Sequence, residues 1–371
     1  MYPGVGGSAL ARTTSEPVPE RLVISIDAMG GDHGPPVAIA GAALALERMA
    51  GRDVSFLLHG DKVQIEAEVA KHPALKNRCE IRHTDLVIAA EEKAAQALRR
   101  GKGSSIWNAV DCVKRGEASA AVSGGNTGAL MAISKVLLRM VGGVERPAAV
   151  ASWPTLRGVT AVLDVGANIA SDAAQLMEFA IMGEAFHCAV HGRPGERTTV
   201  GLLNVGSEEQ KGSEAVREAH RLLRAHDLGF DYYGFVEGND IAMGTVDVVV
   251  TDGFTGNAVL KTGEGMARFF TAILRDTLTS SPMAKAGGLL AAGALRKMKA
   301  RLDPSSVNGG PLLGLNGTVV KSHGGADAKG FANAIKIAAD LAASDYATRI
   351  EQNMERLTAV IDARQPAEAA S

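Results

Sequence analysis

Residues 22–49, LVISIDAMGGDHGPPVAIAGAALALERM, contain one strand, one loop and one helix in that order. Leu22–Ile26 is a short, nearly continuous aliphatic run, typical of a strand that is buried on both faces. Asp27–Gly34 is a polar loop with three glycines. Pro36–Met49 has apolar residues at helical spacing after a proline, which suits the start of a helix. The stretch therefore predicts one repeating unit of an α/β fold.

The same order of strand and glycine-bearing polar loop recurs along the chain. Helical patterns follow at Ala129–Met140 and Ala326–Ala342. Alternation of this kind predicts a mainly parallel sheet, whose strand-to-helix loops lie at one edge and bind ligands there. We therefore expect six loops to converge on one cleft, although glycines that merely form turns are the alternative for any single loop. The five further strand and loop pairs are 118–122 with SGGNTG (123–128), 159–163 with DVGAN (164–168), 199–203 with NVGSEEQKG (204–212), 246–250 with TDGFTGN (251–257) and 318–320 with KSHG (321–324).

A helical hairpin is predicted over 265–302, where the alternation of strands and helices is interrupted. Apolar residues follow helical spacing from Met266 to Leu278, Ser280-Ser281-Pro282 breaks the helix, and a second helix follows. Such a pair suits either the protein core or a dimer interface. Because apolar and basic residues adjoin, it also suits an anionic membrane surface or partner. The residues predicted for that contact are Leu289, Leu290, Arg296, Lys297, Lys299 and Arg301.

Composition bounds the function classes. The 371 residues carry a net charge of -2 and no basic stripe with aromatic residues, which argues against nucleic-acid binding. The three cysteines show no metal or disulfide spacing and indicate a reducing, cytoplasmic compartment. Residues 1–20 lack the apolar centre of a secretion signal and are expected to be a disordered leader. The longest apolar stretch, Ala286–Leu295, is about half the length that a membrane-spanning helix needs.

The loops favour a small anion over a nucleotide. Glycine-rich loops before helices present backbone N–H groups to an anion. The sequence has no GxxxxGK[ST] motif, no GxGxxG dinucleotide motif, and no GxSxG nucleophile elbow. Asp27, Asp32 and His33 cluster locally without the spacing of a metal site. Direct transfer between two bound substrates, without metal or organic cofactor, is therefore the mechanism that we expect.

Several long motifs together resemble the acyl-ACP:phosphate acyltransferases, known as the PlsX family. The resemblance runs from about Leu22 to Ala342 and preserves the family's motif order; Gly125 stands where the family usually has Ala. The motifs are IDAMGGDHGP, SGGNTGALMA, ERPAAVASWP, LDVGAN, GLLNVGSEEQKG, FVEGND, VVVTDGFTGNAVLKT, GGPLLGLNG and VVKSHGGADAKGFANAI.

The resemblance implies a reversible transfer of a fatty acyl group from acyl carrier protein to inorganic phosphate. The acyl phosphate would enter phospholipid synthesis, where a glycerol-3-phosphate acyltransferase is the downstream partner. The resemblance also implies two intertwined α/β lobes, similar to those of phosphotransacetylases and isocitrate or isopropylmalate dehydrogenases. It further implies a homodimer whose hairpin contacts the membrane surface. The catalytic domain would cover 21–345, and a C-terminal helix and tail would cover 346–371.

Within that family, the loop residues gain specific roles. Lys211 is expected to hold phosphate together with glycine-loop amides; the alternative is an ordinary surface lysine. Asn257 and Asn126, and then Asn168, are candidates to polarise the carbonyl, unless each occupies a left-handed turn. His323 and His33 are candidates to protonate the leaving thiolate or to contact phosphate. Asp32 and Asp252 are expected to orient neighbours, and the remaining binding residues are Gly124, Gly125, Thr127 and Gly253.

Two other functions stay open at this point. A phosphotransacetylase-like enzyme would take the acyl group from acyl-CoA instead of the carrier protein. A non-catalytic scaffold for lipid synthesis on the membrane surface would need none of the polar loop residues.

Overall fold

The computed structural model describes residues 21–193, 195–301 and 303–362 of the chain. The predicted leader over 1–20, the end of the tail over 363–371 and Leu302 lie outside the described residues. Side chains at 299–301, 304 and 360–362 lie outside them as well.

The strands follow the predicted runs closely, and several more join them. The run at 159–163 is a strand over the same residues, and the first run is extended by one residue at each end. The strands are β1 (Arg21–Asp27), β2 (Asp53–Gly60), β3 (Cys79–His83), β4 (Ala120–Ser123), β5 (Ala148–Pro154), β6 (Val159–Leu163), β7 (Thr199–Leu203), β8 (Asp231–Val236), β9 (Val248–Val250), β10 (Gly310–Leu313) and β11 (Thr318–Lys321).

The described residues form an 11-stranded sheet in the order β3-β2-β1-β4-β11-β10-β5-β6-β9-β7-β8. The strands from β3 to β11 are mutually parallel and belong to the first lobe. The strands from β6 to β8 are also mutually parallel and belong to the second lobe. Between them, β10 is antiparallel to both β11 and β5, and β5 is antiparallel to β6. The predicted α/β fold with a mainly parallel sheet is confirmed, but its two parallel halves run in opposite directions.

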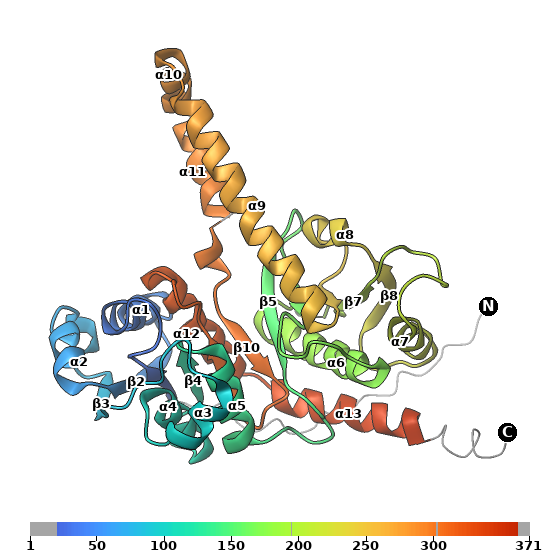
Figure 1. Cartoon of the computed structure of the whole chain (residues 1–371), viewed down its shortest axis with the longest axis horizontal. Helices are drawn as coiled ribbons and strands as arrows, with labels where there is room; N and C mark the ends of the chain where they lie inside the picture. The colour runs from blue at the N-terminus through green and yellow to red at the C-terminus, as the bar shows by residue number, and fades with distance from the viewer. Residues whose placement is uncertain (1–20, 194, 302, 363–371) are drawn as a thin grey trace, which may run out of the picture.

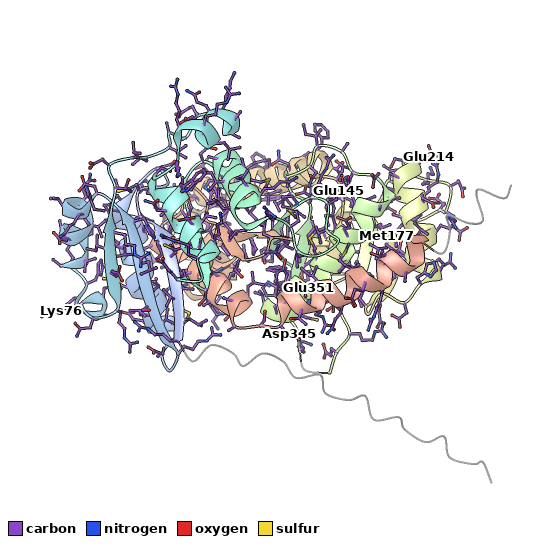
Figure 2. All side chains as sticks on the ribbon, turned by 90° about the horizontal axis from the view of Figure 1, so that it is seen from below. Lys76, Glu145, Met177, Glu214, Asp345 and Glu351 are labelled. Carbon is purple, nitrogen blue, oxygen red and sulfur yellow. The ribbon has the colours of Figure 1, made fainter. Side chains whose placement is uncertain are left out.

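Helices cover both lobes, and the chain crosses between them more than once (Figure 1). After the second lobe, it returns to the first lobe in β11 and in a helix that packs against α1. The last helix then lies across the second lobe; Figure 2 shows it from below, with Asp345 and Glu351 labelled. The helices of the first lobe are α1 (Pro35–Arg48), α2 (Lys62–Val69), α3 (Ala94–Arg100), α4 (Ser105–Lys114), α5 (Thr127–Leu138) and α12 (Ala328–Ala342); the others outside the hairpin are α6 (Ala173–Val190), α7 (Glu214–Ala225), α8 (Gly238–Met243) and α13 (Tyr346–Asp362), with short 3-10 turns at Pro73–Leu75 and Pro304–Ser306.

The strands are buried on both faces, so the core lies between the sheet and the helices that cover it. Ile24 and Ile26 of β1 are fully buried, as are Phe179 and Phe186 of α6. The helix α6 is held in place at its start by Asp172, which accepts a hydrogen bond from the Gln175 backbone N–H.

The hairpin projects beyond both lobes (Figure 1) and differs from the prediction in two respects. Its first helix, α9 (Gly253–Thr279), begins twelve residues before the expected start, and its second half is divided at Ala291 into α10 (Pro282–Leu290) and α11 (Ala292–Arg301). The predicted break is confirmed: the Ser281 hydroxyl accepts a hydrogen bond from the Ala284 N–H and caps α10.

One glycine lets α9 cross closely over β5. A Cβ atom at Gly263 would stand 2.2 Å from the indole ring of Trp153, so any side chain there would collide with the ring. The helix is therefore attached to the sheet at this crossing, and the rest of the hairpin extends away from it (Figure 1).

Candidate active site

The strand pairing places the carboxyl ends of both halves on one line across the sheet. In the first lobe, the last residues of β1, β4 and β11 lie side by side. Lys321, which ends β11, pairs with Gly310 of β10, and a Cβ at Gly310 would stand 2.9 Å from the Val150 carbonyl oxygen. Val150 pairs in turn with Leu163 at the end of β6, and the end of β9 lies between Leu163 and Leu202 of β7.

The loops leave this line in opposite directions, because the two halves of the sheet are antiparallel to one another. The end of β11 is three strand spacings, about 14 Å, from the end of β6. The strand ends are therefore aligned and the loops form two groups, and the expectation that all six loops face one cleft stays a prediction. The first loop group follows β1, β4 and β11, and the second loop group (164–172, 204–213 and 251–257) follows β6, β7 and β9.

Glycines make the first loop group interlock. The Asp32 N–H donates to the Gly324 carbonyl at 2.9 Å, and a Cβ at Gly31 would stand 3.0 Å from that oxygen. A Cβ at Gly124 would stand 3.1 Å from the carbonyl oxygen of Gly30. Asp32 thus orients the neighbouring loop through its backbone, and its side chain is exposed.

His33 and His323 line one small pocket in this group, together with Gly124 and Gly324. The Nδ1 atom of His323 accepts a hydrogen bond from the Gly325 N–H at 3.2 Å. In the neutral ring, this bond leaves the proton on Nε2, which can donate to a substrate. The structure therefore brings the two predicted histidines together and gives His323 the form of a hydrogen-bond donor.

Lys321, which is partly buried at the end of β11, and the buried Asp27 were not predicted as site residues from the sequence. The Lys321 ammonium donates to the carbonyl oxygen of Gly124 at 3.1 Å and to that of Ser322. Burial lowers the pKa of Lys321 to about 8, opposed by the charges of Asp27 and Asp32. Burial also raises the pKa of Asp27, which accepts a hydrogen bond from the Ser123 hydroxyl at 2.7 Å. The signal in the sequence was a lysine directly after a buried strand.

In the second loop group, Asp164 organises the backbone. Its carboxylate accepts hydrogen bonds from the N–H groups of Ala149, Ala167 and Asn168 at 2.6–3.0 Å. Burial raises the pKa of Asp164, and these hydrogen bonds oppose the rise. A Cβ at Gly256 would stand 1.9 Å from the Asp164 carbonyl oxygen, so the first turn of α9 can lie against this loop only with glycine there.

The glycine-rich stretch after β9 is therefore the beginning of a helix rather than an extended loop. Asp252 caps α9: its carboxylate accepts from the backbone N–H and the hydroxyl of Thr255 at 2.9 and 2.8 Å. The orienting role that we expected for Asp252 in the site stays a prediction. Gly253 donates its N–H to the Asn168 carbonyl at 2.7 Å, which joins the loops after β6 and β9.

The three nominated asparagines differ in how their amides are used. Asn126 caps α5 and donates to the carbonyl oxygens of Ala89, Ala90 and Glu92. Asn168 is buried and donates to Pro147 and Asp164. Asn257 is exposed in α9, and its side chain makes no hydrogen bond to any described residue.

The left-handed alternative fails for all three asparagines. Within the described part of the chain, the one residue other than glycine with a positive φ is Arg139. The bonding pattern favours Asn257 as an oxyanion donor and favours a structural role for Asn126 and Asn168. Gly125 lies just before Asn126 and donates its N–H to the Ser123 hydroxyl, and Thr127 is exposed in the first turn of α5.

Lys211 is exposed in the loop after β7, where its carbonyl accepts a hydrogen bond from the Asn204 side chain. A Cβ atom at Gly206 would stand 3.4 Å from the Cγ atom of Lys211, so the aliphatic part of Lys211 lies beside the start of this loop. Its ammonium has no ion-pair partner among the residues that the structure describes. An open groove of about 940 Å³ begins next to this loop and is lined by Ser213, Arg217, Ala170 and Arg146, among others.

The hairpin exposes large apolar side chains. Leu289 and Leu290 are 79% and 91% exposed, and Phe269 and Phe270 of α9 are more than half exposed. Arg296 and Lys297 are exposed as well, whereas the side chains of Lys299 and Arg301 lie outside the described residues. Among the described helices, none is both long and apolar enough to span a bilayer.

Comparison with known proteins identifies the family. The model of a family described as "Fatty acid synthesis protein" matches residues 22–349. A phosphate acyltransferase of Caulobacter vibrioides is 66% identical over 340 residues, which cover 92% of this chain and 93% of the relative. The chain belongs to the phosphate acyltransferase (PlsX) family. It is an acyltransferase of lipid synthesis, as the motifs predicted.

Another relative supports this family, and solved structures of other proteins share its fold. A phosphate acyltransferase of Maricaulis maris is 55% identical over 334 residues, or 90% of this chain and 95% of the relative. A phosphotransacetylase from Streptococcus pyogenes has a TM-score of 0.58 at 16% identity, covering 88% of this chain and 95% of that one. The EutD phosphotransacetylase from Staphylococcus aureus has a TM-score of 0.55 at 16% identity, covering 87% and 94%. These structures share the fold that the family resemblance implied.

Proposed function

We propose that this acyltransferase moves a fatty acyl group from the thioester of acyl carrier protein to inorganic phosphate. The observation that carries the proposal is the match, over at least nine tenths of both chains, to relatives named phosphate acyltransferase. The second loop group supports it, because Lys211 and Asn257 offer a cation and an amide without other partners among the described residues. The product, an acyl phosphate, would serve phospholipid synthesis.

In the proposed reaction, a phosphate oxygen attacks the carbonyl carbon of the thioester. The new C–O bond forms, the C–S bond breaks, and the sulfur leaves with the electron pair and takes up a proton to give the carrier thiol. Lys211 offsets the charge of phosphate, and the Asn257 amide donates to the developing oxyanion. Phosphate is already a nucleophile and the thioester is an activated donor, so holding them together is the main task. This chemistry requires no metal or organic cofactor.

His323 and His33 belong to the other loop group, and we assign them a supporting role. From the first lobe, the Nε2–H of His323 would donate to the phosphate or to the leaving sulfur. This role requires that both loop groups face one substrate, so it places the reaction between the two lobes. The backbone amide of Gly124 would complete the anion site from the first lobe.

We further propose that the enzyme is a cytoplasmic homodimer that associates peripherally with anionic membranes. The exposed apolar residues of the hairpin support both contacts, since patches of this kind usually mark interaction surfaces. The downstream glycerol-3-phosphate acyltransferase would then receive the acyl phosphate close to the lipid. The catalytic domain is proposed to cover 21–345, with the C-terminal helix α13 docked on the second lobe.

The deciding experiment follows thiol release from purified enzyme with acyl carrier protein thioester, with and without phosphate. We expect phosphate-dependent release and formation of acyl phosphate, and reformation of the thioester when acyl phosphate and free carrier are supplied. Faster turnover of acyl-CoA than of the carrier thioester would instead favour the phosphotransacetylase-like alternative. Thioester that persists in the presence of phosphate would favour the non-catalytic scaffold.

A further inference from the structure

Each of the three loops in the second loop group carries one large apolar side chain that is mostly in water. Ile169 follows β6 and is 84% exposed, Val205 follows β7 and is 77% exposed, and Phe254 follows β9 and is 70% exposed. We call these three residues the apolar rim. Single exposed apolar residues are common, but three of them in loops that follow neighbouring strands indicate an apolar surface.

The sheet brings the loops that carry the apolar rim next to one another. The strands β6, β9 and β7 are adjacent, and Leu163, Val250 and Leu202 lie level with one another at their ends. Two strand spacings, about 10 Å, therefore separate the ends of β6 and β7. The hydrogen bond from the Gly253 N–H to the Asn168 carbonyl joins the residues directly before Phe254 and Ile169.

The same three loops hold the polar residues of the proposed reaction. Val205 directly precedes Gly206, against which the Cγ of Lys211 lies. Asn257 is one helical turn after Phe254, and a Cβ at Gly166, in the loop of Ile169, would stand 3.6 Å from the Asn257 Cβ. The apolar rim thus shares its three loops with the residues beside which the thioester carbonyl would sit.

We propose that the apolar rim binds the donor's acyl chain along its length and so makes the enzyme favour long chains over short ones. This inference rests on the proposed function, which supplies an acyl chain whose carbonyl lies at Asn257. Of the groups that the reaction brings to this edge, the acyl chain is the one with extended apolar surface to remove from water. The charged groove beside Lys211 suits the polar arm of the carrier better than the chain.

The test compares donors of different chain length on single-site variants. Phe254→Ser, Ile169→Ser and Val205→Ser are assayed with palmitoyl- and hexanoyl-carrier protein at saturating phosphate. Each methylene removed from water contributes about fourfold in affinity. We expect the ratio of kcat/KM for palmitoyl to hexanoyl donor to fall on the order of tenfold in Phe254→Ser, and less in the other two variants. Phe254→Leu, which keeps an apolar side chain, should restore most of the ratio.

Val63→Ser is the matched control. Val63 is 75% exposed and occupies the second position of α2, as Phe254 does in α9, but it lies on the first lobe away from the loops. Its substitution should leave the ratio unchanged.

Three results would overturn the inference. If the parent shows phosphate-dependent transfer and the Phe254, Ile169 and Val205 variants keep its chain-length ratio, the rim does not bind the chain and the proposed function stands. If those variants change from dimer to monomer in sedimentation while the ratio stays constant, the rim is an interface between copies. If the parent releases no thiol with phosphate, the proposed function fails and this inference fails with it.

Discussion

Among single residues, the candidates differ in whether their polar side chain already has a hydrogen-bond partner in the protein before substrate binds. Asn257 has an amide with no partner among the described residues, whereas the amide of Asn126 is fully used within the first lobe. We expect Asn257→Ala to lower kcat about 100- to 1,000-fold, the usual effect of losing one oxyanion donor. Its stability should stay within about 0.5 kcal/mol, because the side chain is exposed in a helix. An unchanged kcat would exclude the role.

Asn126→Ala should behave differently from Asn257→Ala. It removes the cap of α5, so the expected loss is about 1 kcal/mol in the free energy of unfolding. Urea unfolding of both variants, measured beside kcat, separates a structural amide from a catalytic one. A larger loss of stability in Asn257→Ala than in Asn126→Ala would reverse the assignment.

The ammonium of Lys211 is the second residue to test. A hydrogen bond to a charged group contributes about 1.5–3 kcal/mol, so Lys211→Ala should reduce kcat/KM for phosphate by about 10- to 100-fold. Lys102→Ala, at another exposed lysine in a loop, is the control and should match the parent. Steady-state kinetics with varied phosphate provide the measurement. If both the KM for phosphate and kcat stayed at the parent's values, Lys211 would be a surface lysine.

For single residues, the sequence predicted where a residue lies relative to the strands better than it predicted the hydrogen bonds of its side chain. It placed Lys211 and His323 in loops that follow strands, as the structure does, whereas Asn257 lies in the first turns of α9. It did not show that Asn126 and Asn168 are bonded internally, because their partners, such as Ala89 and Pro147, come from other segments. Lys321 was passed over because the burial that lowers its pKa depends on loops that are distant in the sequence.

Among the helices and strands, α9 shows how glycine residues can make the start of a helix resemble a loop in the sequence. Gly253 and Gly256 made its first turn resemble a loop, yet both are required by contact with the loop after β6, where a larger residue would collide. Strands such as β6 and β7 were predicted with their actual bounds, since aliphatic runs ending in a polar loop are a local signal. The reversed direction of β10 is set by pairing between distant segments, which periodicity does not record.

Helix α6 carries a buried carboxyl group that makes stability depend on pH. Burial raises the pKa of Glu178 from 4.5 to about 7, and the carboxylates of Glu145 and Asp172 add to the rise. Between these values the folded chain keeps a proton that the unfolded chain has lost, so the free energy of unfolding falls as pH rises. In Glu178→Gln this fall should be smaller. Urea unfolding between about pH 5 and about pH 8 measures the difference, and parallel curves for parent and variant would contradict it.

The hairpin tip provides a test of membrane contact. Each basic residue near an anionic surface contributes about 1 kcal/mol, so the tip should bind vesicles weakly and in a salt-sensitive manner. In flotation on anionic liposomes at low salt, the parent should float, whereas a Leu289→Glu/Leu290→Glu variant should not. Val63→Glu controls for added charge. Equal flotation of parent and variant, or none in either, would contradict membrane contact, and a monomeric variant would assign the tip to the dimer.

For the whole molecule, the exposed face of α9 predicts a second copy of the chain. Helix α9 projects beyond both lobes (Figure 1), and its residues Phe269 and Phe270 are each more than half exposed. A stable dimer commonly buries about 800 Å² on each partner, which a projecting helix of this length can supply. Sedimentation should therefore show a dimer for the parent and a monomer for Phe269→Asp/Phe270→Asp, with Val136→Asp as control. A monomeric parent would contradict this arrangement.

The crossing of α9 over β5 gives the protein an internal fluorescent probe. Trp153 lies directly under Gly263, and the other of the two tryptophans, Trp107, is in α4 of the first lobe. A Trp107→Phe variant would therefore emit from a single indole at the root of the hairpin. Any movement of the hairpin that uncovers this ring would expose it to water and shift its emission to longer wavelength. Titration with vesicles, phosphate or donor would then show, without any added label, which of them moves the hairpin.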